Sequence, residues 1–277
     1  KQSCDTYFYE IARKLGVDRL RETSVKFGLG EKVLDETFAN EKKGLIPDTK
    51  WKINNLGKGW VIGETLITGI GQGYTQTTPL QLCQMTAQLA NGGYKIYPKI
   101  IVDENSKTAE DIRVIINENR KELDKENSGL EEATELLGFL IKKEHEPLFK
   151  KSKNIRLVRE AMFASTNEIR GTSYSSRIED PKYQFAGKTG TSQVRRITKA
   201  ARELDLSTSE IPYNERDHAL YIAFGPYKNP RYALSVVIEH GGSGSSTAAP
   251  IAKKLFKLII DRHEFREQAR IQGAVTI

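Results

Sequence analysis

Two stretches near the carboxyl terminus have the alternating pattern of β-strands, and they limit the possible folds more than any other feature. In residues 219–224 and again in residues 232–239, the odd-numbered and the even-numbered side chains form two sets that would point to opposite faces. This is the period of two that a strand imposes. The segment between them, residues 225–230, reads Gly-Pro-Tyr-Lys-Asn-Pro and is rich in turn-forming residues. The simplest connection across such a turn is a hairpin, so we expect antiparallel strands here.

The chain before this hairpin has helical spacing instead. The first predicted helix has an apolar face made of Phe8, Ile11, Ala12 and Leu15. Gly16 stops this helix, and Ser3 and Asp5 stand at its entrance. Further helices are predicted from Asp18 to about Gly28, from Thr78-Pro79 to Asn91, from Val158 to Ile169 with Gly171 as the stop, and from Pro250 onward. Residues 50–78 are rich in Gly and Thr with little periodicity, which predicts a structured loop.

The order of these elements indicates the fold class. Helices followed by antiparallel strands and a covering helix are typical of the α+β class rather than of a doubly wound sheet. Residues 1–170 are expected to form a mainly helical portion, and residues 171–277 a sheet portion with the final helix. Residues 103–153 are strongly charged, so we expect a solvated helical insertion there. The 277 residues, 38% of them hydrophobic, can bury a sizeable core.

Composition argues against several classes of protein. Lys+Arg 43 against Asp+Glu 36 gives 43 − 36 = +7, but basic and acidic residues are interleaved, which favours an ordinary solvated surface over a basic binding patch. Cys4 and Cys83 are too few for a disulfide framework and form no C-x-x-C pair, so the redox compartment stays open. No apolar run approaches the roughly 18 residues of a membrane span. Residues 1–5 lack the pattern of a signal peptide.

Several familiar motifs fail their tests. Gly187-Lys188-Thr189 would need a glycine at Lys182 to complete a phosphate-binding loop. Gly69, Gly71 and Gly73 lead to Gln76 where a dinucleotide fingerprint needs its last glycine. Residues 240–245 miss the serine-hydrolase elbow because Ser245 replaces the final glycine. Four histidines with no HExxH give no support for a zinc site, so neither a metal nor a cofactor is expected.

Residues 185–192, Phe-Ala-Gly-Lys-Thr-Gly-Thr-Ser, give the sharpest chemical signal. On a strand, Lys188 and Gly190 point to one face, and Thr189 and Thr191 to the other. The glycine removes side-chain bulk, so another backbone can approach. The segment therefore predicts a strand edge along which an extended peptide can pair, beside an ammonium group and two hydroxyls.

These residues resemble the penicillin-recognising serine transferases, whose motifs are Ser-x-x-Lys, Ser-x-Asn and Lys-Thr-Gly. Lys188-Thr189-Gly190 matches the third motif, and Ser3-Cys4-Asp5 stands where the second would be, with Asp in place of Asn. Three segments are similar to the connection between these motifs in class B penicillin-binding proteins: Gly63-Glu64-Thr65, Gly71-Gln72-Gly73-Tyr74 and Thr77-Thr78-Pro79-Leu80-Gln81. Residues 216–219 and 239–244 look closest to the penicillin-binding protein 2 branch, the elongation D,D-transpeptidases.

The resemblance implies a β-lactamase/transpeptidase-like fold, an antiparallel sheet flanked by helices with an all-helical subdomain. It implies that residues 1–277 are the carboxyl-terminal part of one transpeptidase domain, incomplete at the amino terminus. No serine of the chain is followed three residues later by lysine, so the acylated serine and its lysine base are not matched. In the family they precede the Ser-x-Asn motif. A fragment, a truncated form or a split gene would each account for this, and the chain alone is expected to be inactive.

The resemblance also implies roles for matched residues. Ser3 would relay a proton, and Lys188 would supply positive potential for the terminal carboxylate of the substrate. The hydroxyls of Thr189 and Thr191 are candidates for that carboxylate, and the Thr191 N–H for the oxyanion hole. An ionised Asp5 cannot donate a hydrogen bond as Asn can, so the alternative role expected for it is to hold a lysine by charge. Taken alone, Ser3 and Asp5 fit a helix cap better than a catalytic role, and only the match of Lys188-Thr189-Gly190 favours catalysis. The assignment therefore requires Ser3 and Lys188 to share a groove.

Three function classes follow. The first is a serine-type D,D-transpeptidase that cross-links peptidoglycan stem peptides and binds β-lactams, with carboxypeptidase or β-lactamase as relatives that these residues do not separate. The second is a non-catalytic or degenerate sensor of the same fold. The third, a nucleic-acid-binding protein, is motivated by the net charge and residues 188–202, but no aromatic platform lies nearby. The family resemblance implies the periplasmic face of the inner membrane, an anchor upstream and a polytopic glycan polymerase as partner.

Overall fold

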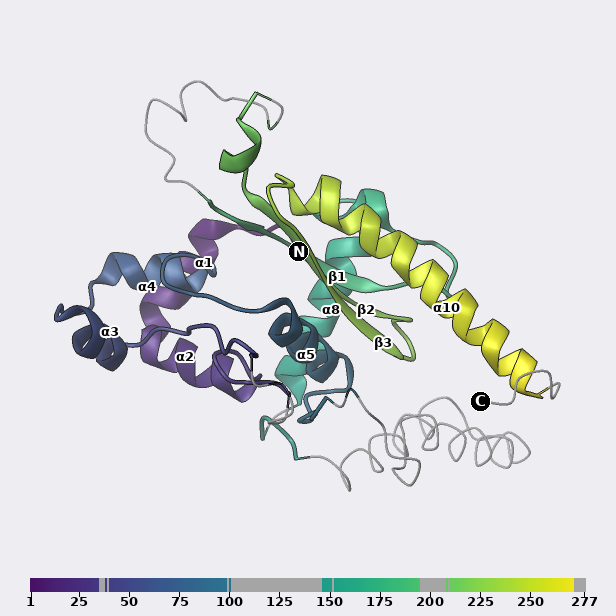
Figure 1. The fold of residues 1–277 in the computed structure, drawn as a ribbon, viewed down its shortest axis with the longest axis horizontal. Helices are drawn as coiled ribbons and strands as arrows, with labels where there is room; N and C mark the ends of the chain where they lie inside the picture. Colours follow the sequence, from purple (N-terminus) through teal and green to yellow (C-terminus); the bar gives the residue numbers. More distant parts are fainter. Residues whose placement is uncertain are drawn as a thin grey trace.

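The protein contains helices packed around one small sheet (Figure 1). The computed structural model describes residues 1–34, 40–98, 146–150, 152–194 and 210–271, together with Phe38, Ile100 and Thr208. Its helices are α1 (Asp5–Leu15), α2 (Val17–Lys26), α3 (Thr49–Leu56), α4 (Ile62–Gly69), α5 (Pro79–Ala90), α8 (Lys153–Asn167) and α10 (Ala249–Ile271). The strands are β1 (Ala186–Ser192), β2 (His218–Gly225) and β3 (Tyr232–Ile238), and a π-helical turn, η4 (Gly244–Ala248), precedes α10.

The three strands form an antiparallel sheet in the order β1-β2-β3. Lys188 of β1 lies opposite Ile222 of β2, and Ala223 of β2 lies opposite Leu234 of β3. The predicted hairpin and the α+β class are therefore confirmed. Among the described residues β1 has a neighbour on one side only, so one edge of the strand that carries Lys188 is open.

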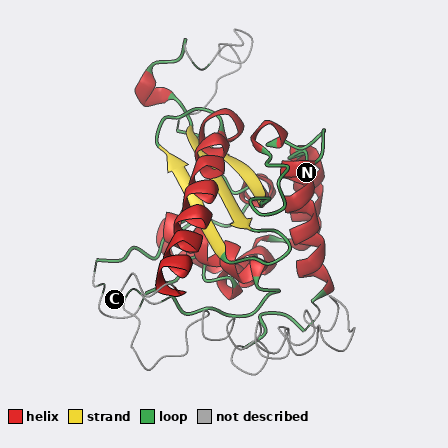
Figure 2. Ribbon diagram, turned by 90° about the vertical axis from the view of Figure 1, so that its right-hand side faces the viewer, coloured by secondary structure: helices red, strands yellow, loops and turns green. Residues whose placement is uncertain are grey.

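Helices cover both faces of this sheet (Figure 2). The long helix α10 packs on one face, where Phe185, Tyr221 and Phe256 are fully buried. The helices α5 and α8 pack on the other face around a second apolar cluster of Leu89, Ala90, Ile155, Met162, Ala186 and Phe224. Because both faces are buried, the alternation of β2 places apolar residues on each side, Tyr221 and Ala223 on one and Ile222 and Phe224 on the other.

The helices α1 to α4 form a separate group that we call the helical lobe. Its centre is the contact of α1 with α4, where Ala12 is buried and a Cβ added to Gly69 would lie 2.3 Å from the Ala12 Cβ. Only glycine permits this approach, so α4 is held close to the helix that follows Ser3. The predicted helix on Phe8, Ile11, Ala12 and Leu15 is confirmed as α1.

The prediction of a structured loop for residues 50–78 is wrong, because α3 and α4 occupy much of it. Each helix has only eight residues, too few for a helical period to show in the sequence. Their ends are marked instead. Asp48 accepts a hydrogen bond from the Trp51 N–H at 2.6 Å, and Gly57 ends α3 in the left-handed conformation. Glu64 accepts from the Val61 N–H at the start of α4.

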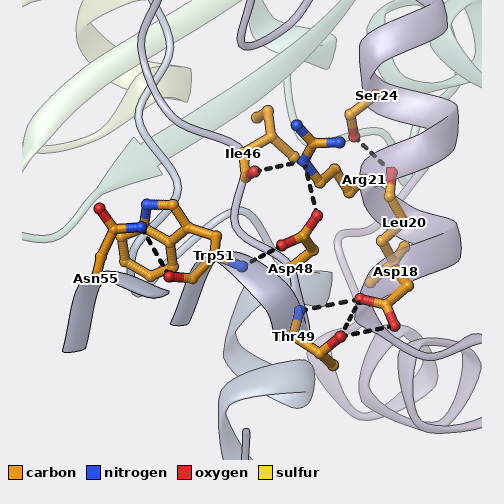
Figure 3. A network of polar contacts seen from close by, with 9 residues as sticks. All are labelled: Asp18, Leu20, Arg21, Ser24, Ile46, Asp48, Thr49, Trp51 and Asn55. Carbon is orange, nitrogen blue, oxygen red and sulfur yellow. Dashed lines mark hydrogen bonds and ion pairs between the residues drawn. The ribbon is translucent and has the colours of Figure 1, made fainter. Parts of the chain in front are cut away.

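Polar contacts hold α2 against the start of α3 (Figure 3). The carboxylate of Asp18 accepts hydrogen bonds from the N–H and hydroxyl of Thr49, at 3.0 and 3.1 Å. Arg21 donates to the carbonyl of Ile46 and forms an ion pair with Asp48. These contacts fix the direction in which the chain enters α3 within the lobe.

The remaining helix predictions agree in position with small differences in bounds. The helix α2 begins one residue before Asp18, α5 begins at Pro79 as predicted, and α10 begins at Ala249, one residue before Pro250. The helix α8 begins five residues before Val158. The charged insertion lies largely outside the described residues. Among the helices that the structure describes, none has the length and apolar character to cross a bilayer.

The helical lobe contains one buried ion pair whose removal should be costly. Lys52 is 5% exposed, and its Nζ donates to both carboxylate oxygens of Glu64, one at 2.6 Å, while Trp60 lies beneath the ammonium group. Burial raises the pKa of Glu64, but hydrogen bonds from Lys52 and the Val61 N–H outweigh it and hold that pKa below its ordinary value.

We therefore expect Lys52→Met to lower the free energy of unfolding by about 3 kcal/mol, because Glu64 keeps its charge without its partner. Chemical denaturation of the protein measures this loss. The matched control is Lys58→Met, at an exposed lysine of the same segment, which should change the free energy by no more than about 0.5 kcal/mol. Equal effects of the two substitutions would contradict the stabilising role of the pair.

Candidate active site

The structure brings Ser3 and Lys188 together although 185 residues separate them. The Lys188 Nζ lies 2.6 Å from the Ser3 Oγ, and the two residues come from different elements, the entrance of α1 and the middle of β1. Ser3 has φ +50°, a left-handed conformation that is unusual for a residue with a side chain. Such strain is typical of functional sites, where the surrounding structure holds a side chain in place.

The surroundings of Lys188 lower its affinity for a proton. Burial lowers the pKa of the Lys188 ammonium, and the negative charge of Asp5 opposes this shift. The same ammonium donates to the Thr189 carbonyl at 2.8 Å. Asp5, the first residue of α1, is therefore near enough for its negative charge to oppose the lowering of the Lys188 pKa.

The hydroxyl of Thr189 connects β1 to α8. It donates to the Thr172 hydroxyl at 3.2 Å, and Thr172 is in turn 3.1 Å from the Ser165 hydroxyl. Ser165 is fully buried on α8. A hydroxyl that is both held by a partner and half-buried keeps a fixed orientation, so Thr189 presents its oxygen beside Lys188 in one direction.

A second group of buried hydroxyls lies under the strand. The phenol of Tyr221 on β2 is 2.9 Å from the Thr166 hydroxyl and 3.0 Å from the Ser173 hydroxyl, and all three residues are fully buried. A Cβ added to Gly187 would lie 2.3 Å from the Tyr221 phenol oxygen. Gly187 therefore lets β1 pass directly over this group, and the residue before Lys188 cannot carry a side chain.

The open edge of β1 contacts the helical lobe at one further point. Gln72, in the turn after α4, donates its side-chain amide to the Thr191 carbonyl at 2.9 Å. Gly190 also packs closely, because a Cβ on Gly244 of η4 would lie 2.5 Å from the Gly190 carbonyl oxygen. The side chain of Thr191 is exposed at the end of β1.

Of the residues predicted from the sequence, Ser3, Asp5, Lys188 and Thr189 lie together, and Gly190 and Thr191 continue along the same edge. Two contacts of the site, those of Thr172 and Gln72, are not predicted by any pattern in the sequence. The family resemblance includes the segment Gly71-Gln72-Gly73-Tyr74, but no local signal shows that Gln72 reaches residue 191. The described residues contain no group of three or more side chains suited to hold a metal ion.

Comparison with known proteins identifies the family of this site. The model of the penicillin binding protein transpeptidase domain matches residues 1–257. The chain belongs to this family. The peptidoglycan D,D-transpeptidase MrdA of Salmonella typhimurium strain SL1344 is 34% identical over 267 residues, and the protein of the same name from Escherichia coli K12 is 30% identical over 263 residues. Each alignment covers 94% of this chain but only 37% and 36% of the relative, so the chain spans little more than a third of their length.

Solved structures of penicillin-binding proteins have the same fold. The complex between penicillin-binding protein PBP2 and MreC from Helicobacter pylori contains a chain with a TM-score of 0.69 and 26% identity. It is matched over 94% of this chain and 39% of its own length. Pseudomonas aeruginosa PBP2 in complex with WCK 5153 has a TM-score of 0.65 and 33% identity, over 92% of this chain and 46% of its own. The predicted fold and the resemblance to the PBP2 branch are thereby confirmed.

Proposed function

We propose that the protein is a peptidoglycan D,D-transpeptidase that works through a serine acyl-enzyme, with Ser3, Asp5 and Lys188 in its catalytic machinery. The observation that carries the proposal is the 2.6 Å contact between the Lys188 Nζ and the Ser3 Oγ at the open edge of β1. Relatives named D,D-transpeptidase support the reaction class. The substrate class is a stem peptide that ends in D-Ala-D-Ala.

The reaction requires a nucleophile that no Ser-x-x-Lys of these 277 residues supplies, so we place it elsewhere in the whole protein. Its oxygen attacks the carbonyl carbon of the peptide bond between the two D-alanines, forming an ester and releasing D-alanine. An amine of a second peptide then attacks the ester and frees the serine. β-Lactams stop at the ester stage, because their leaving group stays tethered.

Ser3 has the geometry of a proton relay. Its hydroxyl can donate and accept at the same time, and Lys188 donates to it at 2.6 Å, so the remaining hydroxyl proton is directed away from the ammonium. In the proposed mechanism that proton passes to the departing amine, while Ser3 recovers a proton from the base of the nucleophile.

Lys188, Thr189, Gly190 and Thr191 form the proposed substrate-binding edge. The ammonium group provides positive potential for the terminal carboxylate. The Thr191 hydroxyl donates to that carboxylate, and the Thr189 hydroxyl donates to it after turning from Thr172. The backbone N–H of Thr191 is the proposed oxyanion donor, and a donor of this kind lowers a barrier by about 3 kcal/mol. Gly190 adds no side chain that would obstruct the peptide.

Labelling with fluorescent penicillin tests the proposed function. The full-length protein should form a covalent adduct that survives denaturation and that unlabelled penicillin prevents. The second candidate, a non-catalytic sensor of the same fold, is favoured by the absence of a Ser-x-x-Lys from this sequence. A sensor would bind the penicillin reversibly and lose it on denaturation, so this outcome would overturn the enzyme in favour of the sensor.

The wider setting is also a proposal. The PBP2 of Helicobacter pylori is described in a complex with MreC, which supports a role in an envelope assembly. We propose that the whole protein lies on the periplasmic face of the bacterial inner membrane and acts with a polytopic glycan polymerase. Co-purification of the two from solubilised membranes tests this partnership.

The charge of Asp5 should be visible in a pH profile. Protonated Lys188 is the form that attracts the substrate carboxylate, so acylation should decline as pH rises through the Lys188 pKa. Burial already lowers that pKa below the ordinary lysine value, and Asp5 limits the decrease. In Asp5→Asn the opposing charge is lost, the pKa falls further, and the alkaline limb of acylation should move to lower pH.

The measurement is the second-order rate constant of penicillin acylation as a function of pH. Asp180→Asn, at an exposed aspartate of the turn before β1, is the matched control and should leave the limb in place. A limb that moves to higher pH in Asp5→Asn, or does not move, would contradict the charge coupling.

A further inference from the structure

The contact between Gln72 and β1 joins two parts of the chain that lie 119 residues apart. Gln72 stands between Gly71 at φ +78° and Gly73 at φ +76°, both in the region that favours glycine. Its own N–H donates to the Ile67 carbonyl at the end of α4, at 3.1 Å. The turn therefore fixes the backbone of Gln72 while its half-buried side chain extends to the Thr191 carbonyl.

The direction of the Thr191 carbonyl follows from the strand pattern. In an antiparallel pair, alternate residues turn both their N–H and their C=O toward the neighbouring strand. The carbonyls of Thr189 and Thr191 are both reached by side chains, from Lys188 and Gln72. Thr189 and Thr191 therefore direct their backbone N–H and C=O groups away from β2. Gly190, between them, directs its backbone groups toward Leu220 of β2.

The side-chain amide of Gln72 thus occupies the place beside the Thr191 carbonyl where a backbone N–H of an added strand would lie. A peptide that extends the sheet along β1 forms its ladder with the outward N–H and C=O groups, and Thr191 offers one of these carbonyls. The Gln72 side chain carries an amide, the same donor group as a peptide backbone, at a hydrogen-bonding distance of 2.9 Å. Because the Thr191 carbonyl points out of the open edge of β1, the Gln72 amide and the N–H of an added strand approach this oxygen from the same side and compete for the same space.

Resting on the proposed function, we propose that Gln72 is a substrate-exchange residue: its amide holds the Thr191 carbonyl in the free protein, and a backbone N–H of the incoming peptide replaces it. The exchange keeps the carbonyl hydrogen-bonded before and after binding, so the edge is never left without a donor. It also favours ligands that carry an amide N–H at this position, because only such a ligand restores the bond that Gln72 releases.

Acylation kinetics of the full-length protein with benzylpenicillin, which carries a side-chain amide, test this exchange. In Gln72→Met the side chain keeps its length but cannot compete for the carbonyl. The apparent dissociation constant of the pre-covalent complex should fall by about 2- to 10-fold, the equivalent of one net hydrogen bond, while the rate constant of the covalent step stays unchanged. Gln72→Asn, which is one methylene too short to reach Thr191, should give the same shift if Gln72→Met fails to fold.

Gln76→Met is the matched control, because Gln76 lies exposed in the same turn and contacts Leu45 through its backbone only. It should leave both constants at their wild-type values. An unchanged or weaker dissociation constant in the Gln72 variants would overturn the exchange, as would a parallel loss of the covalent step and of melting temperature, which would mark Gln72 as a structural link. If the wild-type protein is not labelled, this result contradicts the proposed function itself and therefore also this inference.

Discussion

Replacing Lys188 by methionine should reduce the rate constant of penicillin acylation by at least about 100-fold. The substitution keeps the length and bulk of the side chain and removes only the ammonium group, which lies between the Ser3 hydroxyl and the Thr189 carbonyl. A charge held by burial beside several hydrogen-bond acceptors contributes far more than a surface charge, and truncating such a group typically costs about 2–5 kcal/mol. Pseudo-first-order labelling of the full-length protein measures the change.

The matched control is Lys182→Met, six residues earlier in the chain. Lys182 forms ion pairs with Asp261 and Glu264 on the surface, which contribute little. Its loss should change the acylation rate constant by less than about 2-fold. If Lys188→Met were labelled as fast as this control, the ammonium group would have no part in acylation, and the proposed roles at β1 would be wrong.

Removing the Ser3 hydroxyl should have a second large effect. Ser3→Ala keeps the Cβ, so the steric cost of the φ of +50° is the same for both residues and the comparison isolates the hydroxyl. If Ser3 relays a proton, acylation should slow by about 100- to 1000-fold, within the range expected for a positioned acid–base group. Pre-covalent binding of penicillin should change little, because Lys188, Thr189 and Thr191 are the residues proposed to bind its carboxylate.

Ser24→Ala is the matched control for this substitution. Its hydroxyl donates to the Leu20 carbonyl inside α2 and lies outside the proposed site, so acylation should stay at the wild-type rate. A loss in Ser3→Ala that fell entirely on binding would contradict the relay and would assign Ser3 to substrate recognition instead.

Local signals were sufficient for the elements that form the frame of the site. The alternation of residues 219–224 and 232–239 predicted the hairpin because both strands pack between helices in a regular register. The Thr78-Pro79 start predicted α5, where Thr78 and Gln81 exchange hydrogen bonds. Ser3 and Lys188 could be paired in advance only through the family resemblance, since no local pattern relates residues 185 positions apart.

The missed features depend on long-range contacts. The helices α3 and α4 are short, and contacts such as Gly69 against Ala12 and Lys52 with Glu64 stabilise them more than their own periodicity does. Thr172 and Gln72 reach the site from turns, where sequence spacing says little about direction. Both contacts can be predicted only when the packing of the helical lobe and of α8 around β1 is known.

The most direct test of the account is a crystal structure of the full-length protein after reaction with penicillin. We expect the acyl carbonyl oxygen at the Thr191 N–H, the carboxylate of the adduct within hydrogen-bonding distance of the Thr189 or Thr191 hydroxyl, and Ser3 in contact with Lys188. An adduct formed away from β1, with Lys188 and Ser3 remote from the acyl group, would contradict the central claim that this strand edge is the site of acyl transfer.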